Sequence, residues 1–246
     1  MSLTDDQRRR YARHLNLAEI GEAGQERLRA GRVLVVGTGG LGSPAAFYLA
    51  AAGVGTLGLM DGDVVELSNL QRQIMHRAVD IGRPKVESAA ETLRALNPEI
   101  RLELYPERLT SANAPAILDR YDFVVDAVDN FPSKFLIADA CHAAGKPYSH
   151  AGILQFLGQT MTVHPGRTAC YRCLFDAPPT ETPASGPRGP LGVVPGVIGT
   201  IQAGEAIKHL LGIGKPLTDC LLVYEALSAS FRRIPVRRNP ACRLCG

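Results

Sequence analysis

Short apolar runs alternate with amphipathic segments along the first half of the chain. The run 33–36 is continuously apolar, which is typical of a strand buried on both faces, and the runs 57–60, 100–104 and 121–128 predict three further strands. Residues 1–30, 43–52 and 85–96 predict helices, and in the last of these the apolar positions fall on one face. Strands that alternate with helices in this order indicate a mostly parallel sheet covered by helices.

The pattern changes after about residue 145. Residues 153–163 predict a hairpin that turns near Gly158, and 221–224 and 231–236 predict a second pair of strands. Residues 176–196 are rich in proline and predict a long loop, which a helix at 200–211 follows. The predicted fold class is α/β, with a Rossmann-like, doubly wound sheet whose parallel N-terminal part continues into antiparallel C-terminal strands. We expect a single domain over 1–246, with halves at 1–145 and 146–246.

The amino-acid composition argues against some classes of binding partner. Hydrophobic residues make up 46% of the 246 positions, enough for one large core. The net charge of +3, an aromatic content of 6% and the lack of Trp argue against a nucleic-acid binder that stacks on bases. No apolar run reaches the ~20 residues that span a bilayer, and the polar N-terminus lacks a secretory signal. We therefore expect a cytoplasmic protein that binds neither nucleic acid nor membrane.

A glycine-rich turn follows the first strand. Gly37, Gly39 and Gly42 match the G-x-G-x-x-G pattern, which lets a main-chain turn approach phosphates at the N-terminus of a helix. Asp61 ends the next predicted strand, where a ribose-binding carboxylate belongs. The pattern is also compatible with a tight turn that binds nothing, or with the dinucleotide site of a nicotinamide-dependent oxidoreductase.

Cations and a further carboxylate surround this turn in the predicted sheet. Arg72 lies in a loop of amides, and Lys85 opens a helix, where the helix dipole disfavours a cation unless an anion is near. Asp129 follows a strand, as Gly37 and Asp61 do, so all three converge at the carboxyl ends of the strands. A carboxylate that attacks an α-phosphorus is already ionised, so such a site needs cations, positioning and a magnesium ligand rather than a general base.

The cysteines form two spaced pairs. Cys170 and Cys173 make one C-x-x-C, and Cys242 and Cys245 make the other. Four thiolates in this arrangement predict a tetrahedral structural zinc site without an open position for catalysis. A redox dithiol and unpaired thiols are the alternatives.

Taken together, the motifs resemble those of the MoeB/ThiF/HesA adenylyltransferases, relatives of the ubiquitin-activating enzymes, and the MoeB branch most of all. The similarity rests on the glycine turn, Asp61, the string SNLQRQ at 68–73, GRPKV at 82–86, Asp129 with Asn130, and the cysteine pairs. It spans residues 11–245. The resemblance implies ATP-dependent formation of an acyl-adenylate on the terminal glycine of a ubiquitin-like, MoaD- or ThiS-like sulfur-carrier protein, with release of pyrophosphate.

The resemblance also implies roles for individual residues. Arg72, Lys85 and Asp129 would be catalytic, and Arg13 would reach into the site of a partner subunit, which implies a homodimer. The contacts with ATP and magnesium would come from the glycine turn and the residues near it: Gly37, Gly39, Gly40, Gly42, Asp61, Ser68, Asn69, Gln71, Arg72, Lys85, Asp129 and Asn130.

One position departs from the family pattern. The segment at about 176–196 would be the crossover loop over the carrier's tail, and in many relatives it carries a cysteine where this chain has Ser185. Adenylylation does not need that thiol, so the departure leaves the main prediction unchanged, and we expect a separate sulfur donor. A non-catalytic relative that acts as a binding protein is the alternative that Ser185 raises.

Overall fold

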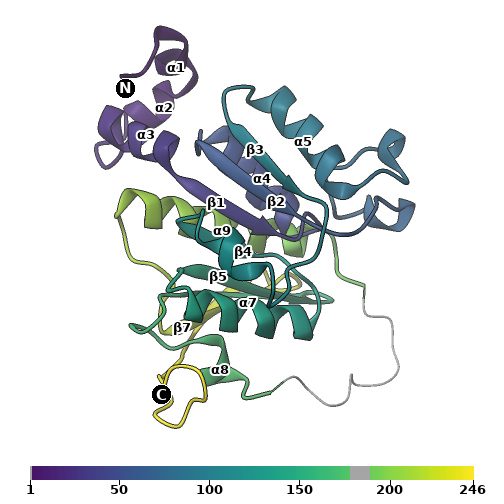
Figure 1. The fold of residues 1–246 in the computed structure, drawn as a ribbon, viewed down its shortest axis with the longest axis vertical. Helices are drawn as coiled ribbons and strands as arrows, with labels where there is room; N and C mark the ends of the chain where they lie inside the picture. Colours follow the sequence, from purple (N-terminus) through teal and green to yellow (C-terminus); the bar gives the residue numbers. More distant parts are fainter. Residues whose placement is uncertain (1, 178–188) are drawn as a thin grey trace.

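An eight-stranded sheet, in the order β3-β2-β1-β4-β5-β6-β7-β8, runs through the computed structural model, which describes residues 2–177 and 189–246 (Figure 1). The strands are β1 (Arg32–Val36), β2 (Thr56–Met60), β3 (Arg101–Tyr105), β4 (Phe123–Asp126), β5 (Tyr148–Leu154), β6 (Leu157–Val163), β7 (Cys220–Glu225) and β8 (Ser230–Pro235). The helices are α1 (Asp5–Arg10), α2 (Ala12–Leu15), α3 (Gly21–Ala30), α4 (Gly42–Ala51), α5 (Lys85–Leu96), α6 (Ala114–Leu118), α7 (Phe131–Ala143), α8 (Tyr171–Leu174) and α9 (Val193–Leu211), with short 3-10 helices η1 (Leu67–Asn69) and η2 (Ala78–Asp80).

The sheet changes direction in its middle, as the sequence predicts. Strands β3, β2, β1, β4 and β5 are parallel, whereas β5, β6, β7 and β8 pair antiparallel. The parallel half has the doubly wound order, in which the chain runs outward from β1 first to one side and then to the other.

Each face of the sheet has its own hydrophobic core. Val33 and Val35 of β1 pack into the core that α4, α5 and α9 cover, and Leu34 and Val36 pack into the core beneath α6 and α7. Figure 1 shows α7 in front of the sheet and α9 behind it. Because successive side chains of a strand point to opposite faces, a strand between two cores must be apolar throughout, which explains the run at 33–36.

Two predicted boundaries are wrong, and both involve α9. The hairpin turns at residues 155–156, between the paired Leu154 and Leu157, and not near Gly158. Gly158 lies within β6, where an added Cβ would stand 2.5 Å from Ile198 of α9, so the glycine permits close packing rather than a turn. Helix α9 begins at Val193 rather than 200, because Pro195 falls in its first turn, where no main-chain N–H is needed.

The N-terminal and central helices add detail that the sequence patterns did not show. Residues 1–30 were predicted helical, and the structure divides them into α1, α2 and α3. Helix α7 and the first half of β5 were not predicted. In the described part of the chain, none of the helices combines the length and the apolar character that crossing a bilayer requires.

Candidate active site

A cavity of about 1160 Å³ opens at the carboxyl ends of β1, β2 and β4. Gly37, Asp61 and Asp129, which follow these strands, all line it, so the predicted convergence is observed. Pockets for one small molecule usually measure about 300–1,000 Å³. The cavity therefore has room for a nucleotide together with part of a second reactant.

The glycine turn is shaped by steric necessity. Gly37 has φ +96°, and a Cβ there would lie 2.7 Å from the Ala127 carbonyl oxygen. A Cβ on Gly42 would lie 1.9 Å from the Gly37 carbonyl oxygen, so Gly42 closes the turn from behind. Gly39 and Gly40 line the cavity and leave its wall open to the main chain. This geometry suits the close approach of a phosphate.

Two side chains hold the turn between its glycines. The carboxylate of Asp61 accepts hydrogen bonds from the N–H and the hydroxyl of Thr38, at 2.9 and 3.1 Å. His76, which the sequence did not single out, contacts the Thr38 carbonyl through Nε2 at 3.0 Å and Ser88 of α5 through Nδ1 at 2.9 Å. Burial lowers the pKa of His76, so its ring is neutral at pH 7 and ties the turn to α5.

Several cations line the cavity, among them Arg72, Lys85 and Arg108. Arg72 donates to the Ser68 carbonyl at 3.0 Å, which extends its side chain along the wall. Lys85, the first residue of α5, is buried, and its Nζ lies 3.4 Å from an oxygen of Asp63. Asp63 is thus an anion near this lysine, although Arg108 shares it at 3.0 Å. The hydrogen bond from Arg108 lowers the pKa of Asp63, which stays ionised.

Several predicted contact residues lie outside the cavity lining. Ser68 donates to Glu66, and Asn69 accepts from the Glu66 N–H at 3.1 Å, so both brace the start of their loop. Gln71 is exposed, whereas its neighbour Gln73 is 5% exposed and lines the cavity.

Two further predicted site residues differ in position: Arg13 lies outside the cavity lining, whereas Asn130 belongs to it. Arg13 is exposed on α2 and does not line the cavity of its own chain. Asn130 lines the cavity, but its Oδ1 accepts from the Ser133 N–H at 3.0 Å and caps α7. Asp129, next to it, is exposed to the cavity.

Apolar and aromatic side chains of the C-terminal half also line the cavity. Leu154, Leu157 and Val223 of the antiparallel strands line it, together with Tyr171 and Phe175 at α8. Tyr171 packs against Phe175 with ring centroids 5.1 Å apart. The cavity thus extends from the glycine turn to the antiparallel half of the sheet.

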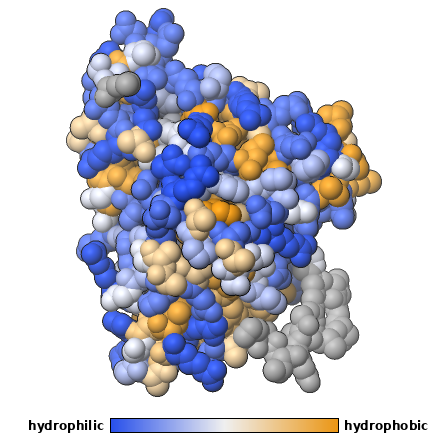
Figure 2. Space-filling view, in the orientation of Figure 1, coloured by the Kyte–Doolittle hydropathy of each residue, from blue (hydrophilic) through white to orange (hydrophobic). Residues whose placement is uncertain are grey.

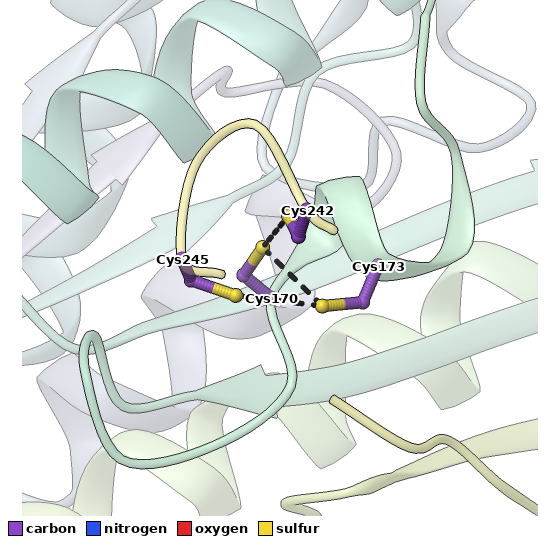
Figure 3. A group of neighbouring side chains, drawn as sticks. All are labelled: Cys170, Cys173, Cys242 and Cys245. Carbon is purple, nitrogen blue, oxygen red and sulfur yellow. Dashed lines mark hydrogen bonds between the residues drawn. The ribbon is translucent and has the colours of Figure 1, made fainter. Parts of the chain in front are cut away.

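The four paired cysteines meet at one point, beside α8 and the C-terminus (Figure 3). Their sulfur atoms all lie within 4.8 Å of one another, and Cys170 Sγ is 3.8 Å from Cys173 Sγ and 3.6 Å from Cys242 Sγ. The Cys173 and Cys245 sulfurs are 3.4 Å apart. All four are free thiols, so the two C-x-x-C pairs form one cluster and no disulfide.

The fold and the cavity define a Rossmann-like α/β protein with a glycine turn at the carboxyl end of its first strand. The ThiF family model matches residues 11–244, and the chain belongs to the ThiF family. It is 50% identical to the sulfur carrier protein adenylyltransferase of Thermus thermophilus, over 100% of this chain and 93% of that protein. It is 48% identical to the SAMP-activating enzyme E1 of Haloferax volcanii, over 100% of this chain and 92% of that protein.

Solved structures agree on the fold. Escherichia coli MccB with selenomethionine MccA superposes with a TM-score of 0.85 at 22% identity, over 99% of this chain and 75% of that one. At this identity the likeness shows the fold alone. The family and its relatives confirm the predicted MoeB/ThiF/HesA membership and an adenylyltransferase as the enzyme class.

Proposed function

We propose that the enzyme uses ATP to adenylylate the C-terminal glycine carboxylate of a ubiquitin-like, MoaD- or ThiS-like sulfur-carrier protein. The observation that carries the proposal is the cavity, in which a glycine turn and cations meet apolar side chains of the antiparallel strands. The names of the Thermus and Haloferax relatives support the class of substrate. A cytoplasmic location stays a prediction from the sequence.

In the proposed reaction, the phosphates of ATP lie on the main chain of Gly39 and Gly40, and Arg72 and Lys85 offset their charge. The carrier's tail enters along the apolar side chains of the antiparallel strands. Its terminal carboxylate oxygen forms a bond to the α-phosphorus, and the bond from that phosphorus to the bridging oxygen breaks. Pyrophosphate leaves with the electron pair of that bond. Because the attacking carboxylate is already ionised, no general base is needed.

Asp129 suits a magnesium ligand. Its carboxylate is exposed to the cavity, and no hydrogen bond or ion pair engages it among the described residues. When bound, magnesium would neutralise charge on the phosphates. Asp129 would hold the ion, and Asp61 would keep the turn in shape.

The cysteine cluster suits zinc. A Zn–S bond of about 2.3 Å in a tetrahedral site places neighbouring sulfurs about 3.8 Å apart. The observed sulfur–sulfur distances of 3.4, 3.6 and 3.8 Å are close to that value. We assign the four cysteines a structural zinc ion.

A homodimer would bring Arg13 of one subunit to the cavity of the other. Support comes from the loop between β2 and α5, which carries Arg72 and exposes apolar side chains. Figure 2 shows hydrophobic surface on that side of the molecule. The exposed fractions are 72% for Leu67, 62% for Ile74 and 79% for Val79. A second copy would cover such a surface.

Two alternatives have less support. A nicotinamide-dependent oxidoreductase has only the glycine turn and Asp61 in its favour, and it leaves Arg72, Lys85 and the cysteine cluster without a role. A non-catalytic binding protein rests on Ser185, which lies outside the described residues. We retain a separate sulfur donor as part of the proposal.

Pyrophosphate exchange tests the proposal. Labelled pyrophosphate should enter ATP when the enzyme meets a MoaD- or ThiS-like protein, and a carrier without its terminal glycine should give none. We expect Arg72→Ala and Lys85→Ala each to reduce exchange by about 100-fold or more. Lack of exchange with every small carrier encoded near the gene, or tight NAD binding without ATP binding, would contradict the proposal.

A further inference from the structure

Three ionisable side chains lie buried beside the cavity, and the proposed reaction gives none of them a role. Asp126 ends β4, Lys134 lies on α7 and His150 lies on β5, with exposed fractions of 0%, 6% and 1%. Lys134 and His150 also line the cavity. Because a buried ion pair is weak as a source of stability, its presence at this place needs another explanation.

Asp126 lies at the centre of the group. Its carboxylate contacts His150 Nδ1 at 2.9 Å and lies 3.4 Å from Lys134 Nζ. Burial works to raise the pKa of Asp126, but the charge of Lys134 and the hydrogen bond from His150 outweigh it and lower the pKa. Burial lowers the pKa of His150. The group holds one negative charge, one positive charge and a neutral ring, so it adds no net charge to the cavity.

The other contacts of the group reach the main chain at Val128. Its N–H donates to Asp126 at 3.3 Å, and its carbonyl accepts from the Lys134 ammonium at 2.6 Å. Lys134 also donates to the Ala151 carbonyl of β5, so each of its three protons has an acceptor. Both peptide groups of Val128 are therefore held, directly before Asp129.

The main chain after Asp129 is held as well. The Asn130 side chain accepts from the Ser133 N–H at 3.0 Å and caps α7, and the Asn130 carbonyl accepts from the Lys134 N–H at 3.2 Å. Asp129 thus lies between two anchored residues, while its own carboxylate is exposed to the cavity. A side chain with free oxygens on a fixed main chain is arranged to bind a ligand with little loss of conformational freedom.

We propose that Asp126, Lys134 and His150 are positioning residues, which set the place of Asp129 through the main chain of Val128 and not through their charge. This inference rests on the proposed function, from which it takes the role of Asp129 towards magnesium and ATP. A displacement of about 1 Å at a catalytic site can cost on the order of 100-fold in rate. Loss of the Val128 contacts therefore impairs the reaction, although no residue that touches substrate has changed.

Paired substitutions separate positioning from stability. Lys134→Met alone leaves the Asp126 carboxylate buried without its cation and lowers the melting temperature. Asp126→Asn with Lys134→Met removes both charges, keeps an acceptor for the Val128 N–H and restores the melting temperature towards that of the wild type. We expect this pair to need at least tenfold more magnesium for half-maximal pyrophosphate exchange. Recovery of the wild-type magnesium dependence together with stability would overturn the inference.

A double-mutant cycle with Asp129→Ala tests whether the paired substitution changes the magnesium dependence through Asp129. In that background the Asp126→Asn/Lys134→Met pair should change the magnesium dependence less than twofold, because the residue through which it acts is gone. An effect as large as in the wild-type background would show a general structural role and would contradict the inference.

The same comparison can be made without a carrier protein. Calorimetric titration with magnesium and ATP should show weaker binding to the Asp126→Asn/Lys134→Met pair than to the wild type, and equal binding would overturn the inference. If the wild type binds ATP but shows no exchange with any carrier, the proposed substrate fails while this comparison still decides on the positioning role.

Discussion

Gly42 is where a single added methyl group should do most damage to the glycine turn. Its Cβ would stand 1.9 Å from the Gly37 carbonyl oxygen, which belongs to the main chain and cannot rotate away. We expect Gly42→Ala to destabilise the protein by about 1–3 kcal/mol through overpacking and to abolish ATP binding. Urea unfolding and calorimetry measure the two effects.

Gly204 of α9 supplies a matched control for that substitution. An added Cβ there meets nothing within 4 Å. Because alanine is the better helix former, Gly204→Ala should raise stability by about 0.5–1 kcal/mol. Equal stability of the two variants would show that the turn is not as tightly packed as described.

His76 gives a prediction about pH. Burial lowers its pKa in the folded protein, so the unfolded chain, with an ordinary pKa of about 6.5, binds the proton first as the pH falls. Its contribution to stability is complete above about pH 6.5 and declines below it. We expect His76→Gln to flatten the fall in unfolding free energy between pH 7 and 5 by up to about 1.4 kcal/mol per pH unit. An unchanged slope in urea titrations would show that this ring is not neutral in the fold.

At the scale of the elements, α8 depends on contacts with other parts of the chain. A helix of four residues does not hold itself together, and Cys170 and Cys173 join it to the C-terminal pair. Tyr171 of α8 packs on His150, with ring centroids 4.4 Å apart, and lines the cavity. The cluster therefore supports the wall of the cavity that α8 forms.

Loss of the metal should consequently affect the carrier more than ATP. We expect Cys173→Ser to lose bound zinc and to raise the KM for the carrier about tenfold or more, with little change in ATP affinity. Cys220→Ser, on β7 and outside the cluster, should keep its zinc and its KM. Full zinc content in the Cys173 variant, or an equal loss of ATP binding, would contradict this account.

At the scale of the whole molecule, a substitution of Arg13 can distinguish a monomer from a dimer with shared sites. Arg13→Ala and Arg72→Ala should each be nearly inactive alone. If Arg13 acts in the partner's site, a mixed dimer of the two variants contains one intact site, so an equal mixture allowed to exchange subunits recovers about a quarter of the wild-type activity by random pairing. The recovered pyrophosphate exchange should depend on the time allowed for subunit exchange. No recovery in a mixture shown to contain mixed dimers would exclude a shared site.

The local pattern determined the outline of the fold because a parallel strand between two cores has few alternatives. The run at 33–36 and the acids and glycines after the strands follow from that rule, and parallel strands bring their carboxyl ends to one edge. The cysteine cluster could likewise be predicted from the sequence, since thiolates at this spacing suit one metal. The sequence thus sufficed for the parallel half, the glycine turn and the cysteine cluster.

Only the tertiary structure decided what depends on contacts between distant residues. Gly158 looks like a turn residue until α9 is seen packed against it, and the hydrogen bonds of Ser68 and Asn69 with Glu66 are known only from the structure. No sequence pattern marks His76 or Lys134, because their roles arise from main-chain carbonyls that the fold brings within reach. Periodicity records which face of an element is buried, but not which polar atoms meet once the layers have packed.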